Sequence, residues 1–253
     1  MRESGNTILI TGGASGIGLA FAERFLEAGN QIIICGRRAD KLEEAKAKFP
    51  ALHTRVCDVG NEHDRVELCD LLVREFPNLN VLVNNAGIQQ WVNVQRTEEE
   101  WAHFHQEIAI NFDAPIHLTL RLLPHLLKQP HAAIINVSSG LALAPATWAP
   151  IYSATKAALH SFTQSLRLQL EGTKVDVIEI LPPAVNTDLG GPGLHTFGAP
   201  LNEFADGVFA SLRGGEIEIG YGDSERRLHA SREDLAEAAR QMWLGFRKRN
   251  PEF

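Results

Sequence analysis

The chain has 253 residues, 44% of them hydrophobic, and carries a formal charge of −7 because 31 acidic residues outnumber 24 lysines and arginines. A nucleic-acid surface needs clustered positive charge, so this composition argues against a nucleic-acid partner. No apolar stretch approaches the roughly 18 residues that a membrane span needs. Cys35, Cys57 and Cys69 lack metal-ligand spacing, which indicates buried thiols in a reducing compartment. We therefore expect a soluble, cytoplasmic protein without a membrane partner.

A glycine-rich turn follows the first expected strand, residues 7–11, and precedes a helical apolar pattern that ends at Gly29. Strand, glycine turn and helix in this order can hold the pyrophosphate of a dinucleotide, because the helix start presents free N–H groups. Gly12 would allow the tight turn, Gly16 the approach of the backbone to the pyrophosphate, and Gly18 the close packing of helix on strand. The alternative is a flexible glycine loop without a ligand.

Apolar runs alternate with helical patterns along the rest of the chain. This alternation is typical of an α/β fold in which helices cover both faces of a parallel sheet. The seven expected strands lie near residues 7–11, 31–35, 51–56, 79–83, 132–138, 174–180 and 216–219. Polar or glycine-rich turns come directly after the first six strands. We therefore expect a ligand site at the carboxyl ends of the strands, where such sheets bind their ligands.

Tyr152 and Lys156 lie four residues apart in a helical pattern, and Ser139 comes thirteen residues before Tyr152. An i,i+4 pair shares one face of a helix, so the phenol and the ammonium group can point into the same space. The positive charge is expected to lower the pKa of the tyrosine and to make the pair an acid/base device. The same spacing also occurs in helices that merely pack a tyrosine and solvate a lysine.

Together these motifs resemble the short-chain dehydrogenase/reductase family, in order and in spacing, over most of the chain. The matching segments are Thr11–Gly18, Asp58, Asn84–Gly87, Asn111, Ser139 and Tyr152–Lys156. The resemblance implies a single, doubly wound Rossmann-type domain over residues 1–253. It also implies an NAD or NADP cofactor, hydride transfer between the nicotinamide and a carbonyl or alcohol, and a homodimer or homotetramer.

The catalytic residues that the resemblance implies are Asn111, Ser139, Tyr152 and Lys156. Tyr152 would donate a proton to the substrate oxygen, Ser139 would hydrogen-bond the same oxygen, and Lys156 would stabilise the phenolate. Asn111 would interrupt a long helix and hold a water in a proton relay. The implied cofactor-binding residues are Gly12, Ser15, Gly16, Ile17, Gly18, Arg37, Arg38, Asp58, Val59, Asn85, Ala86, Gly87, Tyr152, Lys156, Val185 and Thr187. The histidines form no metal-binding motif, so no metal site is expected.

The turn after the second strand bears on the choice of cofactor. It contains Arg37 and Arg38 and no acidic residue. An acid at this place holds the ribose hydroxyls of NAD, whereas an arginine pairs with the additional phosphate of NADP. NADP(H) is therefore the preferred cofactor, and NAD(H) stays possible because arginines on a loop can simply be solvated.

One residue departs from the family pattern. Ala184 follows the sixth strand where the family usually has glycine, and alanine takes a positive φ at a higher energetic cost. The backbone beside the nicotinamide is therefore expected to run differently. Thr187 still matches the residue expected to bond the carboxamide.

The substrate pocket is expected between Trp91, residues 141–148 and residues 188–200. Apolar side chains prevail there, which favours a lipophilic ketone or alcohol over a sugar or a phosphate ester. Glycines in the segment around 188–212 indicate a lid that closes over the bound cofactor. The C-terminal segment from Ser224 is expected to form one exposed amphipathic helix that could pack on a second subunit.

Two other functions stay open. One is a regulatory protein that binds NADP(H) to sense redox state without turnover. The other is an NAD-dependent alcohol dehydrogenase of the same family. The presence of Ser139, Tyr152 and Lys156 favours an enzyme, because a sensor could dispense with all three side chains.

Overall fold

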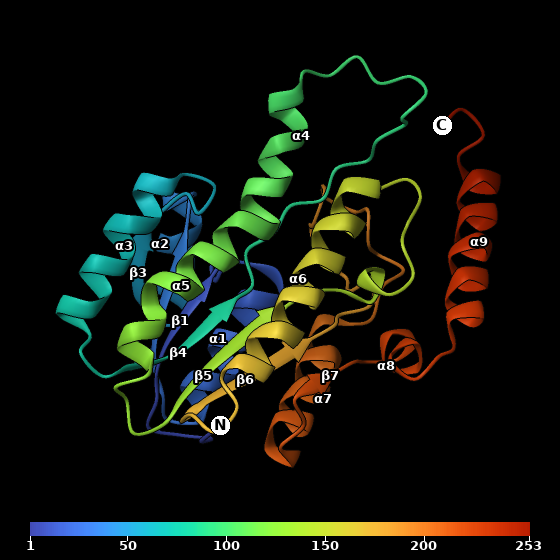
Figure 1. Cartoon of the computed structure of the whole chain (residues 1–253). Coiled ribbons are helices and arrows are strands. Elements are labelled where there is room, and N and C mark those ends of the chain that lie inside the picture. The colour runs from blue at the N-terminus through green and yellow to red at the C-terminus, as the bar shows by residue number, and fades with distance from the viewer.

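Short runs of branched apolar residues form one parallel sheet at the centre of the computed structural model, which describes residues 1–253 (Figure 1). The strands are β1 (Thr7–Thr11), β2 (Gln31–Gly36), β3 (His53–Val56), β4 (Leu79–Asn84), β5 (Ala132–Val137), β6 (Val175–Ile180) and β7 (Glu218–Ile219). They lie in the order β3-β2-β1-β4-β5-β6-β7, and every neighbouring pair is parallel. The predicted seven-stranded sheet is confirmed, and each strand ends within two residues of its expected bounds.

The central strands are buried on both faces. Ile8, Leu9 and Ile10 of β1 are all 0% exposed although successive side chains of a strand point to opposite sides. A strand covered on both sides reads as a continuous apolar run, which is why these strands were recognisable in the sequence. Three of the buried side chains in the fold are free thiols, as predicted: Cys35, Cys57 and Cys69.

Helices cover both faces of the sheet. One face carries α1 (Gly16–Glu27), α2 (Ala39–Lys48) and α7 (Leu201–Gly214), and the other carries α3 (Glu62–Glu75), α5 (Ala114–Leu126) and α6 (Pro150–Gln169). On the first face, Phe21 of α1 stacks on Phe204 of α7 with ring centroids 6.1 Å apart. On the second face, Leu72, Leu122 and Leu166 belong to one buried cluster. The doubly wound Rossmann-type arrangement is therefore confirmed.

The strand order reverses direction between β1 and β4, and the ends of these two strands are tied together. Thr11, the last residue of β1, accepts hydrogen bonds from the backbone N–H groups of Asn85 and Ala86 at 3.0 Å each. Parallel sheets bind their ligands outside the carboxyl ends of the strands at such a reversal. This edge of the sheet is therefore the place to look for a site.

The remaining helical segments surround that edge. They are α4 (Trp101–Ile108), the π-helical turn η1 (Ala109–Asp113), the 3-10 turn η2 (Gly140–Ala142), α8 (Asp223–Leu228) and α9 (Arg232–Arg249). The single helix predicted from Ser224 is wrong, because Ser231 accepts a hydrogen bond from the Asp234 N–H at 3.1 Å and starts a new helix. No helix in the fold combines the length and hydrophobicity that crossing a bilayer requires.

Residues 188–212, predicted as a lid, contain two different kinds of structure. Residues 188–200 form turns and irregular backbone, whereas α7 begins at Leu201. Phe204 and Val208 of α7 are 0% exposed in the core. A lid that included this helix would have to expose both side chains, so the lid stays a prediction for residues 188–200 only.

Candidate active site

The glycine-rich turn after β1 has the shape that its sequence predicts. Gly12 and Gly16 have φ angles of +64° and +53°, in the left-handed region that other residues avoid. A Cβ at Gly18 would overlap the carbonyl oxygen of Gly12 and would lie 2.5 Å from the amide nitrogen of Asn85. Gly12 therefore makes the tight turn and Gly18 permits close packing, as predicted, whereas contact between Gly16 and a pyrophosphate stays a prediction.

The start of α1 presents backbone donors without a capping side chain. Ser15 is the N-cap residue but makes no side-chain hydrogen bond to the helix, which leaves the N–H groups of Gly16 and Ile17 uncapped. The Ser15 hydroxyl instead accepts a hydrogen bond from Arg38 Nη2 at 3.2 Å. Arg38 and the neighbouring Arg37 are both exposed. Free N–H groups at the helix start, with the Arg38 guanidinium beside them and Arg37 next to it in the chain, suit a ligand with several phosphates.

The loops after β3 and β4 lie at the same edge of the sheet. Asp58 is half-buried, and its Oδ1 accepts the N–H of Gly60 at 2.9 Å. Val59 beside it is buried. Asn85 Nδ2 donates to the carbonyl oxygen of Thr11 at 2.9 Å, so this side chain secures the end of β1 where the glycine turn begins. Contacts of Asp58 and Asn85 with an adenosine moiety stay predictions.

Asn111 interrupts the long helix, as predicted. It lies in the wider π-helical turn η1 between α4 and α5 and is 1% exposed. Its Oδ1 accepts the N–H of Ile88 at 2.9 Å, and its Nδ2 donates to the Ile88 carbonyl at 2.8 Å. The same Nδ2 donates to Thr155 Oγ1 at 3.3 Å. Asn111 therefore joins the loop after β4 to helix α6.

Ser139, Tyr152 and Lys156 come together at the end of β5. Ser139 follows β5 as the N-cap of η2 and accepts the Leu141 N–H at 3.1 Å. The phenol of Tyr152, which is 6% exposed, lies near the Ser139 hydroxyl. Lys156 Nζ lies 5.6 Å from the centroid of the Tyr152 ring and donates to the Val137 carbonyl at 2.8 Å.

Gly87 connects this group to Asn111. A Cβ at Gly87 would lie 3.3 Å from Asn111 Oδ1 and 3.6 Å from Lys156 Nζ. The four predicted catalytic side chains thus lie together at the carboxyl edge of the sheet, although they come from three separate parts of the chain. The uncapped N–H groups at the start of α1 lie at the same edge of the sheet.

Burial controls the protonation of the tyrosine and lysine. Burial raises the pKa of Tyr152 well above its ordinary value of 10.0, the neighbouring Ser139 hydroxyl opposes this, and the charge of Glu107 adds to it. Burial lowers the pKa of Lys156 to about 8 against the opposing charges of Glu107 and Glu179. The prediction that Lys156 lowers the pKa of Tyr152 is therefore wrong, because removing the phenolate from water dominates in this structure.

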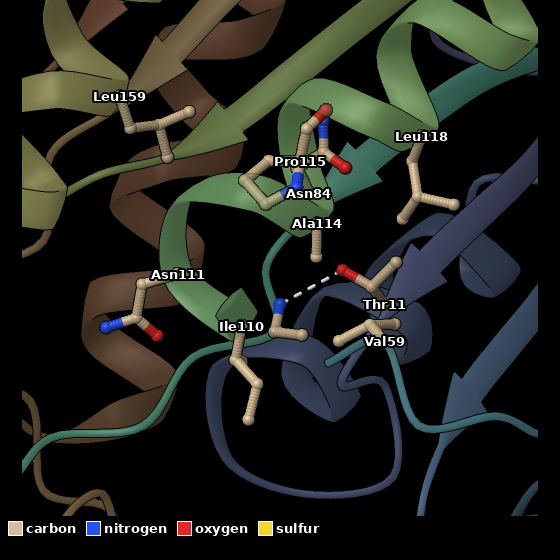
Figure 2. A pocket seen from close by; sticks show the side chains of 10 residues that line it. Thr11, Val59, Asn84, Ile110, Asn111, Ala114, Pro115, Leu118 and Leu159 are labelled. Atoms are coloured by element: carbon tan, nitrogen blue, oxygen red, sulfur yellow. Dashed lines mark hydrogen bonds between the residues drawn. The ribbon is translucent and has the colours of Figure 1, made fainter. Parts of the chain in front are cut away.

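A small cavity of about 10 Å³ lies between the sheet end and the π-helical turn (Figure 2). Thr11, Asn84 and Asn111 give it polar walls, and Ile110 and Leu159 are among its apolar neighbours. A volume of this order is about what one water molecule requires. The predicted water relay at Asn111 stays a prediction, for which this cavity offers a place.

Ala184, in the segment after β6, does not adopt the left-handed conformation, because only glycines in this structure have a positive φ. The Ala184 carbonyl accepts the N–H of Ala199 at 2.8 Å, and the Asn186 N–H donates to Ala199 at 2.9 Å. Val185 is buried within this pairing. A Cβ at Gly16 would lie 3.5 Å from Thr187 Cγ2, so the segment faces the glycine turn.

Aromatic rings pack beside Tyr152. Leu141, Trp148 and Leu189 pack on the small cluster that contains Tyr152. Phe246 of α9 stacks on Trp148 with centroids 4.4 Å apart and planes 5° apart, and it meets Trp91 edge-on at 5.2 Å. The C-terminal helix, predicted to be exposed, therefore places a buried ring over the active-site region of its own chain. Figure 1 shows α9 at the outer right of the molecule, to the right of α6.

Two residues of this region were not predicted. Glu107 is fully buried and lies four residues before Asn111, so its position on the same helical face could have revealed it. Phe246 had a weaker signal, since Trp243 and Phe246 are three residues apart in a segment that is otherwise rich in charge.

Comparisons with known proteins agree with this geometry. The short chain dehydrogenase family model matches residues 6–194. An uncharacterized oxidoreductase of Bacillus subtilis, DltE, is 46% identical over 247 residues, which are 96% of this chain and 98% of the relative. The NADP-dependent 3-hydroxy acid dehydrogenase YdfG of Escherichia coli is 32% identical over 70% of this chain, which corresponds to 72% of the length of YdfG. A solved short-chain dehydrogenase from Sphingobium yanoikuyae, in complex with NADPH, has a TM-score of 0.78 and 27% identity over 95% of each chain.

Proposed function

Because the chain belongs to the short-chain dehydrogenase family, we propose that it transfers a hydride between NADP(H) and the carbonyl or alcohol group of a lipophilic substrate. The observation that carries this proposal is the convergence of Ser139, Tyr152 and Lys156 at the carboxyl edge of the sheet. A donor hydroxyl, a phenol and a buried ammonium group in one place form an acid/base site for a carbonyl oxygen.

In carbonyl reduction, Tyr152 donates its phenolic proton to the substrate oxygen, on which negative charge develops. Ser139 hydrogen-bonds the same oxygen and fixes its position, and Lys156 stabilises the phenolate that remains. A bound nicotinamide supplies the hydride. Since burial raises the pKa of Tyr152, the phenol stays protonated at neutral pH and is ready to act as the acid. In alcohol oxidation the same groups act in reverse.

NADP(H) fits the proposed cofactor site better than NAD(H). Arg37 and Arg38 follow β2, and the Arg38 guanidinium reaches the start of α1. Both guanidinium groups can pair with a phosphate on the adenosine ribose, and the turn Gly36–Arg38 contains no carboxylate that would repel this phosphate. The dependence of YdfG on NADP and the NADPH in the Sphingobium structure support the same choice.

A lipophilic substrate fits the surroundings of Tyr152. Trp148, Leu189 and Phe246 are apolar neighbours of the site, and Trp91 lies at its edge. Apolar and aromatic walls with a few polar groups at one end are typical of pockets that bind small apolar molecules. Residues 188–200 would close over this pocket as a lid, with the glycines of the segment as hinges.

The proposed assembly is a homodimer or homotetramer. Leu120 and Leu168 are 57% and 71% exposed; Leu120 lies on α5, which follows Asn111, and Leu168 lies on α6, which contains Tyr152. Burial of these leucines between copies would remove apolar surface from water. Analytical ultracentrifugation should find at least two copies per particle, and a monomer at micromolar concentration would contradict this part of the proposal.

A panel of substrates tests the proposed activity. NADPH and NADH are each mixed with aliphatic and aromatic ketones, sugars and phosphate esters, and the nicotinamide absorbance is followed. We expect oxidation of NADPH with the apolar ketones. NADPH binding without turnover of any substrate would favour a redox sensor, and faster turnover with NADH would favour an NAD-dependent alcohol dehydrogenase.

A further inference from the structure

Glu107 is a buried carboxyl group that the proposed reaction leaves without a role. It lies on α4 and is 0% exposed. Its Oε1 accepts the N–H of Gln90 at 3.0 Å, whereas Oε2 is also buried and receives no hydrogen bond. An ionised carboxylate is unfavourable when it is removed from water and only one of its two oxygens accepts a hydrogen bond. The environment of Glu107 therefore favours its protonated form.

The carboxyl group acts on the catalytic pair through its charge. Helix α4 packs against α6, which carries Tyr152 and Lys156. An ionised Glu107 raises the pKa of both residues, since it opposes the phenolate and favours the ammonium ion. Burial raises the pKa of Glu107 itself to about 7, with the Gln90 N–H and Lys156 opposing the shift. The charge beside the pair therefore changes near neutral pH.

Few other charges compete at this place. Residues 85–92, which include the hydrogen-bond donor to Glu107, contain no titratable side chain. The titratable groups on the neighbouring elements are His103 and His105 of α4, Tyr152, Lys156, His160 and Arg167 of α6, Glu179 of β6, and Asp188 and His195 of the segment that touches Gln89. Of these, His103 and Asp188 are exposed, and Glu179 acts on Lys156 and is bonded to His160 at 2.9 Å.

We propose that Glu107 is a positioning residue whose ionised carboxyl group holds Tyr152 as a phenol and Lys156 as an ammonium ion, the charge state that carbonyl reduction requires. The inference rests on the proposed function. Glu107 does not touch the reacting atoms and acts only through the catalytic pair. When Glu107 takes up a proton at lower pH, the opposition to the phenolate disappears, and Tyr152 becomes a better base for alcohol oxidation.

Glu107→Gln tests this role, because glutamine has the same shape and can still accept the Gln90 N–H. The pH profile of alcohol oxidation, which needs the phenolate, should move to lower pH by on the order of one unit. The loss of carbonyl reduction at high pH should move in the same direction. Glu100→Gln, which removes an exposed carboxylate from the start of the same helix, should leave both profiles in place. An active Glu107→Gln enzyme with unmoved profiles would overturn the proposal.

Glu107→Asp provides a rescue experiment and a second variant should glutamine prevent folding. It keeps the negative charge, so its pH profiles should stay close to those of the wild type. A shift as large as that expected for glutamine would show that shape rather than charge matters, and it would contradict the proposal.

Infrared spectroscopy of the protein without substrate gives a readout independent of turnover. The stretch of a protonated carboxyl group should disappear as the pH rises through about 7 and should be missing from Glu107→Gln. A band that persists in the variant would contradict the proposal. If the wild type turns over no substrate, the proposed function fails, and the infrared band still tests the protonation of Glu107. If the wild type is active and the pH profiles of Glu107→Gln do not move, only the proposed role of Glu107 fails.

Discussion

The proposed cofactor side and the proposed substrate side of the site are built in different ways. The cofactor side consists of short local segments, Gly12–Gly18 and Arg37–Arg38, each placed by the strand before it. The substrate side combines Trp91, Trp148 and Phe246, which are far apart in the sequence. Phosphates are bound largely by backbone groups, which demand glycine, whereas an apolar substrate needs only a surface of suitable shape. The cofactor side can therefore be predicted from a sequence motif, whereas the substrate side can be identified only in the folded chain.

Tyr152→Phe should have the largest effect, because it removes the proposed acid, which lies between the cofactor side and the substrate side. Turnover should fall about 10²- to 10⁴-fold, while NADPH binding stays within about twofold. Tyr221→Phe is the matched control, since Tyr221 is the other tyrosine of the chain and packs on Phe204 in the core. Full carbonyl reduction by the Tyr152 variant would remove the proposed acid.

Gly18→Ala should break the cofactor side and leave the substrate side in place. The added methyl group would collide with Gly12 and Asn85, so the turn must shift. We expect NADPH affinity to fall roughly 10- to 100-fold, from a strain of about 1–3 kcal/mol. Gly214→Ala, where the new Cβ would meet only Glu216 at 3.8 Å, should bind NADPH like the wild type. Equal affinities for all three proteins would refute the close-packing argument.

Arg37→Asp sharpens the account of the cofactor side by separating the two nicotinamide cofactors. Loss of a charged partner for the ribose phosphate should weaken NADPH about tenfold or more, because such bonds contribute about 1.5–3 kcal/mol. Binding of NADH, which lacks this phosphate, should change little. Fluorescence titration with both cofactors measures the difference, and equal losses for the two would speak against a phosphate contact.

Phe246→Ala should alter the substrate side alone. Removing the ring opens space beside Trp148, and KM for bulky apolar ketones should rise several-fold, because one pocket contact contributes about 1–3 kcal/mol. NADPH affinity should not change. Leu244→Ala changes a 50% exposed residue of the same helix and serves as control. Unchanged KM values for every ketone would show that α9 takes no part in the pocket.

The sequence predicted most of the fold because its signals are local. Continuous apolar runs such as Ile8–Ile10 marked buried strands, and the polar turns after those strands predicted a site at one edge of the sheet. The role of Asn111 came from the family resemblance. The pKa of Tyr152 could not be read in this way, because the degree of burial depends on packing between distant elements. The stacking of Phe246 on Trp148 depends on where α9 packs, and no motif within α9 specifies that position.

A crystal structure of the NADPH complex tests the central claim most directly. We predict that the nicotinamide ring lies beside Gly87, with its reactive carbon facing the space in front of Ser139 and Tyr152, and that Lys156 reaches the attached ribose. Pyrophosphate should lie at the start of α1. A nicotinamide ring bound away from Tyr152, or a dinucleotide that leaves the glycine turn empty, would contradict the account.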